Sequence, residues 1–166
     1  MTRPARPSPH FSWAEVTIRY PGGVRTPGAD LPRLTATAAR ALQRVCIVAE
    51  VIRTDVGEPV HVTSGYRHGD SKQHGAGQAL DIQVRGLSPL QLIARIHRLH
   101  AAGLLPGLRQ VIAEARGTGL DGPMAEGSVR WVHIAVLGVP GEGWTAPASS
   151  MWLQTANGSD YDVWRP

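Results

Sequence analysis

The chain has 166 residues, one cysteine and seven histidines, with a formal net charge of +4. This length favours a single domain, and one cysteine excludes an internal disulfide and a cysteine-rich zinc knuckle. Hydrophobic residues make up 42% of the chain, and no apolar run approaches the ~18 residues of a membrane span. The basic side chains are scattered, without blocks or interleaved aromatic residues, so we expect no nucleic-acid partner.

The N-terminal region is predicted to contain a loose tail and one short helix. Residues 1–9 hold three prolines and show no hydrophobic periodicity, which is typical of a flexible tail. A helix should begin after Ser12, because Glu15 follows at the capping-box spacing. The stretch 20–32, rich in proline and glycine, is predicted to be a loop.

The longest predicted helix covers residues 35–55. Apolar side chains recur there at steps of three and four residues, which places them on one face. Thr35 is the expected N-cap, and Gly57 lies just past the end. Cys46 lies within this helix, and we expect a buried thiol without a chemical role.

The rest of the chain alternates predicted strands, glycine-rich loops and one further helix. The loops cover 65–77 and 117–127, and the helix is opened by the Ser-Pro pair at 88–89 and ended by Gly103. Two long helices and four or more strands without strict alternation predict one α+β domain over 10–166, with a mainly antiparallel sheet and flanking helices. The predicted strands are 59–64, 79–84, 109–114, 129–136 and a short segment, 151–155.

Three residues with metal-ligand chemistry lie in apolar or glycine-rich surroundings. His74 ends a polar loop, and Asp81 lies seven residues later in an apolar strand. Burying an unpaired carboxylate costs several kcal/mol, so Asp81 needs a partner. His133 lies inside another apolar strand. Two histidines and one carboxylate match the protein ligands of a catalytic zinc site, whose fourth ligand is water; the alternative is that the three residues are unrelated.

Three ordered motifs carry a resemblance to a known family. They are Ser-Gly-Tyr-Arg at 64–67, Gln73-His74-x-x-Gly77-x-Ala79-x-Asp81, and Trp131-Val132-His133. They resemble the zinc D-Ala-D-Ala carboxypeptidase and L-alanyl-D-glutamate endopeptidase family, which includes phage endolysins and shares its metal-site fold with hedgehog domains. Segments 11–15 and 110–114 are similar to a phage-associated branch. The resemblance covers 10–137 and leaves a Trp-rich C-terminal extension over 138–166.

The resemblance implies zinc ligands and a substrate-binding arginine in this chain. His74, Asp81 and His133 would bind Zn²⁺, and Arg67 would act on the peptide substrate. A guanidinium can bind a carbonyl oxygen and stabilise a developing oxyanion; the alternative for Arg67 is an ion pair with Asp70. Three neighbours are further candidates for substrate binding, with structural roles as the alternative: Tyr66, Gln73 and His68.

The chain departs from the family pattern at two positions. Lys72 replaces the serine that stands two residues before the first histidine. Many members of the family have an acidic base three residues before the second histidine. In this chain Arg130 occupies that position, and arginine cannot deprotonate water. A neighbouring strand can supply the base instead, and Glu114 is the expected one. Glu126 and Asp121 are the alternative candidates for the base. If one of them is the base, Glu114 is a solvated charge or an ion-pair partner.

These patterns predict a monomeric zinc metallopeptidase that hydrolyses peptidoglycan stem peptides, as an endopeptidase or a D,D-carboxypeptidase. The two departures motivate an alternative, a catalytically weak zinc-containing module for wall binding or for a phage particle. We find no signal peptide, so we expect synthesis in the cytoplasm and action on the wall or in the periplasm, after holin-type release or as part of a phage particle. The positive charge is compatible with an acidic wall polymer.

Overall fold

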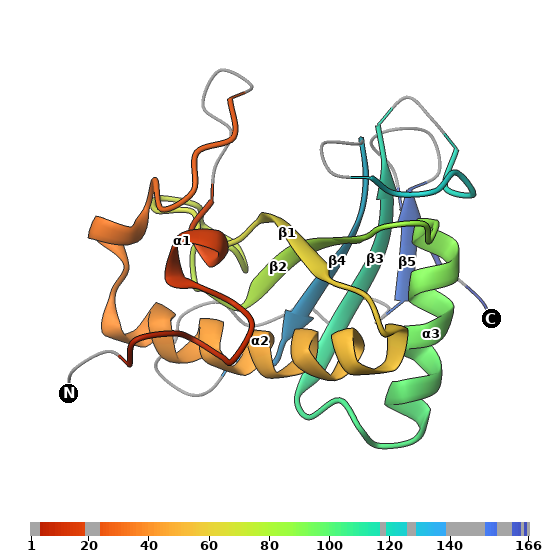
Figure 1. The fold of residues 1–166 in the computed structure, drawn as a ribbon, viewed down its shortest axis with the longest axis horizontal. Coiled ribbons are helices and arrows are strands. Elements are labelled where there is room, and N and C mark those ends of the chain that lie inside the picture. Colours follow the sequence, from red (N-terminus) through yellow and green to blue (C-terminus); the bar gives the residue numbers. More distant parts are fainter. Residues whose placement is uncertain are drawn as a thin grey trace.

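In the computed structural model of this protein, six strands among the described residues form one mixed sheet flanked by helices (Figure 1). The strands are β1 (Val60–Ser64), β2 (Ala79–Val84), β3 (Leu108–Ala115), β4 (Arg130–Val136), β5 (Trp152–Thr155) and β6 (Tyr161–Val163). Their order in the sheet is β1-β2-β4-β3-β5-β6, and all neighbouring strands are antiparallel except β3 and β5. The predicted α+β class and mostly antiparallel sheet are therefore confirmed. The structure describes residues 4–18, 24–116, 119–125, 129–138, 152–155, 161–163 and 165.

The element bounds follow the sequence prediction closely. The short segment β6 lacks a predicted counterpart, since three residues are too few to show periodicity. The helices are α1 (Trp13–Val16), the 3₁₀ helix η2 (Leu31–Arg33), α2 (Ala36–Val56) and α3 (Pro89–Ala101).

The predicted helix caps are all present. Ser12 and Glu15 form the capping box of α1, and the Thr35 side chain accepts a hydrogen bond from an amide in the first turn of α2. Ser88 caps α3 within a second capping box. Gly57 ends α2 with φ of 72°, in the left-handed region that glycine adopts without strain. Local sequence therefore determines where each of these helices begins or ends.

The N-terminal segment before α1 is tied to α2. Ser8 Oγ and the His10 backbone N–H both donate to Glu50 Oε1, at 2.7 and 2.8 Å. His10 Nδ1 lies 2.8 Å from Glu50 Oε2. Burial opposes ionisation of Glu50, but the hydrogen bonds from Ser8 and His10 outweigh it and lower the pKa of this carboxyl. These contacts hold residues 8–10 against the helix.

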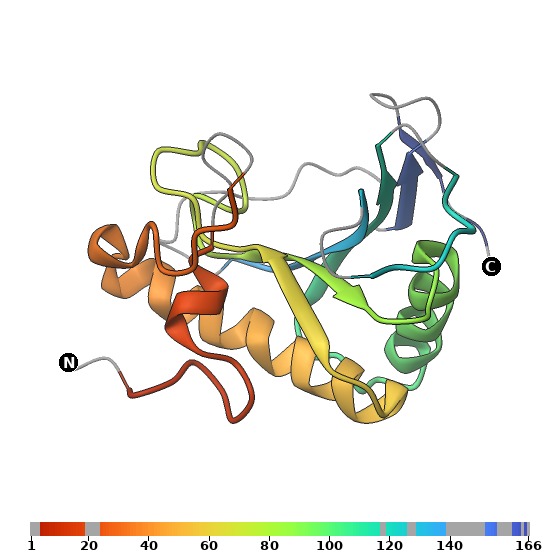
Figure 2. The ribbon, with the colours of Figure 1, turned by 45° about the horizontal axis from the view of Figure 1, so that its top comes forward.

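The hydrophobic core lies between one face of the sheet and helices α2 and α3 (Figure 2). Alternate residues of β2 and β4 point into it, and all are fully buried: Leu80, Ile82, Val132 and Ile134. Cys46 of α2 is also fully buried, as expected, and this burial raises the pKa of its thiol well above the usual range.

We expect the Ile134→Ala substitution to reduce the free energy of unfolding by about 2–5 kcal/mol, because it leaves a cavity in a packed core. Ile134 has no exposed surface, whereas Leu137, just beyond β4, is 55% exposed. The Leu137→Ala control should therefore change stability by less than about 0.5 kcal/mol. Urea unfolding of both variants measures the difference, and equal losses would contradict the assignment of this face to the core.

The opposite face of the sheet carries the polar residues. Strand alternation places Asp81 and Gln83 of β2, Glu114 of β3 and His133 of β4 on this side. Asp81 pairs directly with His133 in the β2–β4 register. Two candidate ligands far apart in sequence are thus adjacent.

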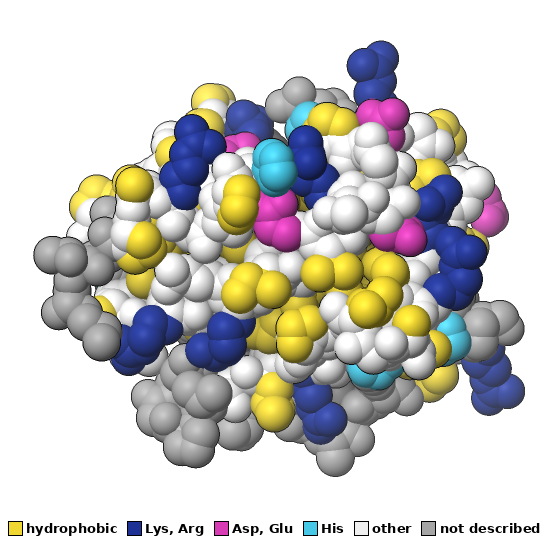
Figure 3. Space-filling model, turned by 60° about the horizontal axis from the view of Figure 1, so that its bottom comes forward, with side chains coloured by type: hydrophobic (Ala, Val, Ile, Leu, Met, Phe, Trp, Pro, Cys, Tyr) yellow, Lys and Arg dark blue, Asp and Glu magenta, His cyan; other side chains and the backbone are white. Residues whose placement is uncertain are grey.

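No helix among the described residues is long and apolar enough to cross a membrane. On the face shown in Figure 3, basic side chains are distributed around a central group of hydrophobic ones and do not form one continuous patch. The C-terminal region 138–166 adds β5 and β6 to the edge of the sheet.

Candidate metal centre

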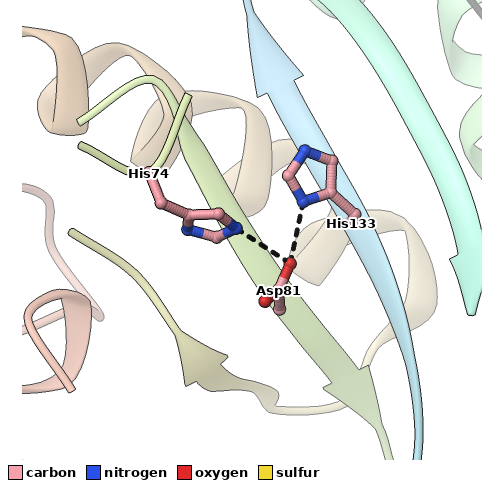
Figure 4. Close-up of side chains that lie close together, drawn as sticks. All are labelled: His74, Asp81 and His133. Atoms are coloured by element: carbon pink, nitrogen blue, oxygen red, sulfur yellow. Dashed lines mark hydrogen bonds and ion pairs between the residues drawn. The ribbon is translucent and has the colours of Figure 1, made fainter. Parts of the chain in front are cut away.

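His74, Asp81 and His133 form a buried triad that could hold a metal ion. One ligand atom from each lies within 4.8 Å of the others. Asp81 and His133 come from paired strands, while His74 reaches the site from the loop before β2 (Figure 4). Each of the three residues is at most 6% exposed.

The two imidazoles converge on a single carboxylate oxygen. His133 Nδ1 lies 2.8 Å from Asp81 Oδ1, and His74 Nε2 lies 3.3 Å from the same atom. Burial would raise the pKa of Asp81, but positive charge on His74 and hydrogen bonds from both histidines hold it well below its usual range. The carboxylate is therefore the ionised group around which the site is built.

The donor pattern of the triad suits a cation. His74 Nδ1 lies 2.8 Å from the carbonyl oxygen of Gly65, which can only accept a hydrogen bond. The Nδ1 atom must therefore carry a proton, and in the neutral ring Nε2 presents a lone pair to Asp81. A lone pair facing a carboxylate oxygen needs a positive charge between them, either a proton or a metal ion. Such an outer hydrogen bond is also what orients metal-binding histidines in proteins.

Arg67 contacts the carboxylate of the candidate metal site directly. Its Nη2 atom donates to Asp81 Oδ2 at 3.0 Å, and its Nε atom donates to Ser64 Oγ at 2.9 Å. The ion pair with Asp70 that the sequence suggested is also present, but longer, at 3.8 Å. Arg67 thus fixes one oxygen of Asp81 and leaves the other oxygen facing the histidines.

The site loop passes so close to α2 that glycine is required at position 77. Gly77 has φ of +73°, and a Cβ atom there would overlap the carbonyl oxygen of Ala38. The Gly77 N–H donates to the His74 carbonyl at 3.2 Å, which closes the turn that carries this histidine. Glycine at position 77 therefore lets the loop fold back beside α2.

We expect Gly77→Ala to destabilise the protein more than Gly69→Ala does. Both positions have positive φ, which costs an alanine about 1–2 kcal/mol. Only Gly77 would also clash with backbone, and overpacking adds about 1–3 kcal/mol; position 69 has nothing within 4 Å. Thermal and urea unfolding of the two variants measures the difference, and equal destabilisation would contradict the close approach at Gly77.

The other predicted substrate-binding residues make contacts within the protein. Tyr66 is 3% exposed, and its hydroxyl donates to the Arg33 carbonyl at 3.2 Å and lies 3.4 Å from His68 Nδ1. Burial, together with the charge of Asp30, raises the pKa of Tyr66. The Gln73 side chain donates to Gln110 of β3 and so ties the site loop to the sheet. Among these candidates only His68 is exposed.

Glu114 lies on the same face of the sheet as His133. It pairs with Trp131 in the β3–β4 register, two residues along from the pair of Ile112 and His133. Its Oε2 atom accepts a hydrogen bond of 2.7 Å from Trp131 Nε1. Of the two alternative bases, Asp121 lies exposed in the loop between β3 and β4, and Glu126 lies outside the described residues.

Sequence reasoning missed two contributors to this arrangement. The Gly65 carbonyl is a backbone group, so no side chain marks it in the sequence. Trp131 was noted only as part of a motif, and its bond to Glu114 depends on the register of β3 against β4. A periodic pattern predicts the strands but not their register.

Comparison of this chain with known protein families, with curated proteins and with solved structures finds no match. A functional proposal must therefore rest on the residues themselves and their geometry.

Proposed function

We propose that this chain is a zinc-dependent peptidase that hydrolyses the stem peptides of peptidoglycan. The observation that carries the proposal is the buried triad of His74, Asp81 and His133, with ligand atoms within 4.8 Å of one another. The ordered motifs around these residues, which resemble those of zinc D-Ala-D-Ala peptidases and phage endolysins with the hedgehog-type metal-site fold, support the choice of substrate.

The donor set favours zinc over the common hard cations. Two imidazole nitrogens with one carboxylate are typical of catalytic zinc sites, whereas magnesium and calcium prefer oxygen ligands. The ligand atoms would be His74 Nε2, Asp81 Oδ1 and His133 Nδ1, which already converge. When bound, zinc supplies Lewis-acid polarisation of a carbonyl and lowers the pKa of water towards ~7.

Two side chains would perform the remaining chemistry. Glu114 would accept a proton from the attacking water and return it to the leaving nitrogen as the amide C–N bond breaks. Arg67 already donates to Asp81 and is 36% exposed. A further N–H of its guanidinium can donate to the substrate carbonyl, where negative charge develops. The products are a carboxylate and an amine, so one water is consumed for each bond cut.

The place of action follows from the substrate. Peptidoglycan lies outside the cytoplasmic membrane, so the proposed site of action is the cell wall or the periplasm. The net charge of +4 favours contact with an acidic wall.

Digestion of purified bacterial sacculi, followed by mass spectrometry of the soluble products, tests this function. The zinc-loaded chain should release fragments with new amino termini, the chelated chain should release none, and added zinc should restore release. Intact stem peptides after incubation with a folded, zinc-loaded chain would contradict the proposal.

A second function has a specific observation in its favour. Arg130 stands where many zinc peptidases with similar motifs place their base, and its side chain donates to the Gly119 carbonyl at 2.8 Å. A chain without a working base would serve as a wall-binding or phage-particle module that retains the metal. Pelleting with sacculi without any cleaved product would favour this module over the peptidase.

A further inference from the structure

We propose that Trp131 is a positioning residue, which holds the Glu114 carboxylate in place for proton transfer. The indole Nε1–H donates to Glu114 Oε2 at 2.7 Å. Both side chains are half-buried. This inference rests on the proposed function, since Trp131 acts only through Glu114.

The strand register places this hydrogen bond on the same face of the sheet as the candidate metal centre. Trp131 pairs with Glu114 across β3 and β4, and His133 follows two residues later on the same face of β4. Glu114 is therefore a diagonal neighbour of His133, and such residues lie roughly 7–8 Å apart, with their Cβ atoms somewhat closer. A glutamate side chain can span much of that distance, so its orientation decides which atoms its oxygens reach.

The indole ring is held on two sides. The Arg116 guanidinium lies over the ring, with Cζ 5.2 Å from its centroid. The backbone N–H of Arg116 donates to the Val129 carbonyl at 2.8 Å, which anchors this end of β3 beside β4. The face of the ring is thus fixed by a cation while its edge donates to Glu114. The donor is therefore held in place by contacts within the protein.

The chemistry of the indole suits this role. Its N–H can only donate, so it bonds a carboxylate as an acceptor and never competes for the same proton. Hydrogen bonds to an ionised carboxylate are about twice as strong as those between neutral groups. A misplacement of about 1 Å in a reacting group can reduce the rate by ~100-fold. Loss of the N–H should therefore lower kcat, while substrate binding remains.

The Trp131→Phe substitution removes the N–H and keeps an aromatic ring. In the zinc-loaded full chain, we expect kcat to fall roughly 10- to 100-fold, with KM and zinc affinity unchanged. The substrate is the mixture of muropeptides that a muramidase releases from sacculi. Trp152→Phe is the matched control, because Trp152 contacts His97 and His100 of α3 on the opposite face of the sheet. This control should retain full activity.

A double-mutant cycle separates positioning from a general structural effect. In the Glu114→Gln background, Trp131→Phe should change kcat by less than about twofold, since its effect passes through the carboxylate. An equal loss in both backgrounds, or full kcat in Trp131→Phe alone, overturns the inference and leaves the proposed function standing. Absence of any hydrolysis by the wild-type chain overturns both.

A spectroscopic readout covers the case in which Trp131→Phe does not fold. The Trp131 Nε1–H resonance should lie downfield in the wild-type nuclear magnetic resonance spectrum and move upfield in Glu114→Gln, because the bond loses its charged acceptor. Asp121→Asn should leave that resonance in place. An unchanged resonance in Glu114→Gln overturns the inference.

Discussion

The Asp81→Asn variant is expected to lose zinc binding and, with it, all peptide hydrolysis. Asparagine keeps the shape of the side chain but removes the charge on which both histidines converge. Even outer partners of metal ligands typically contribute 10–100-fold to affinity, so loss of a ligand should weaken zinc binding by more than about 100-fold. Competition with a chromophoric chelator measures this affinity.

Asp70→Asn provides the matched control for that variant. Asp70 also interacts with Arg67, at 3.8 Å, but lies outside the triad. The Asp70→Asn variant should bind zinc with nearly the wild-type affinity. If Asp81→Asn binds zinc as tightly as Asp70→Asn does, the carboxylate of Asp81 is not a ligand.

The Glu114→Gln variant is expected to keep its zinc and lose most of its activity. A general base contributes about 10²–10⁴-fold to the rate, and an amide cannot accept the proton of the attacking water. The substitution preserves size, and its carbonyl oxygen can still accept the Trp131 N–H. Steady-state kinetics on soluble muropeptides, with zinc content measured on the same sample, separates loss of the base from loss of the metal.

Asp121→Asn tests the alternative base in the same assay. Asp121 is exposed in the loop between β3 and β4, so its amide variant should retain activity if Glu114 is the base. Full activity in Glu114→Gln together with a loss in Asp121→Asn would move the assignment to the loop.

The parts of the fold that local chemistry determines could be predicted from the sequence. Ser12, Thr35 and Ser88 cap their helices as predicted, because capping depends on residues three or four positions apart. The triad could be predicted as well, since His133 and Asp81 are ionisable residues in otherwise apolar strands. Such residues need partners, and here they partner each other.

Contacts that depend on non-local pairing could not be predicted. The sequence offered Asp70 as the ion-pair partner of Arg67 because it is three residues away. That ion pair forms at 3.8 Å, but the β1–β2 pairing also brings Asp81, fourteen residues away, to 3.0 Å from the guanidinium. The parallel pairing of β5 with β3 and the bond between Trp131 and Glu114 likewise depend on strand register. Hydrophobic periodicity specifies which face of a strand is buried but not which strand lies beside it.

Zinc titration of the chelated wild-type chain, followed by X-ray absorption at the zinc edge, tests the metal centre most directly. We predict one zinc per chain, with nitrogen and oxygen ligands at about 2.0–2.2 Å and no sulfur ligand, as expected if the buried Cys46 takes no part. A folded chain that binds no zinc, or binds it through sulfur, would contradict a metal centre formed by His74, Asp81 and His133.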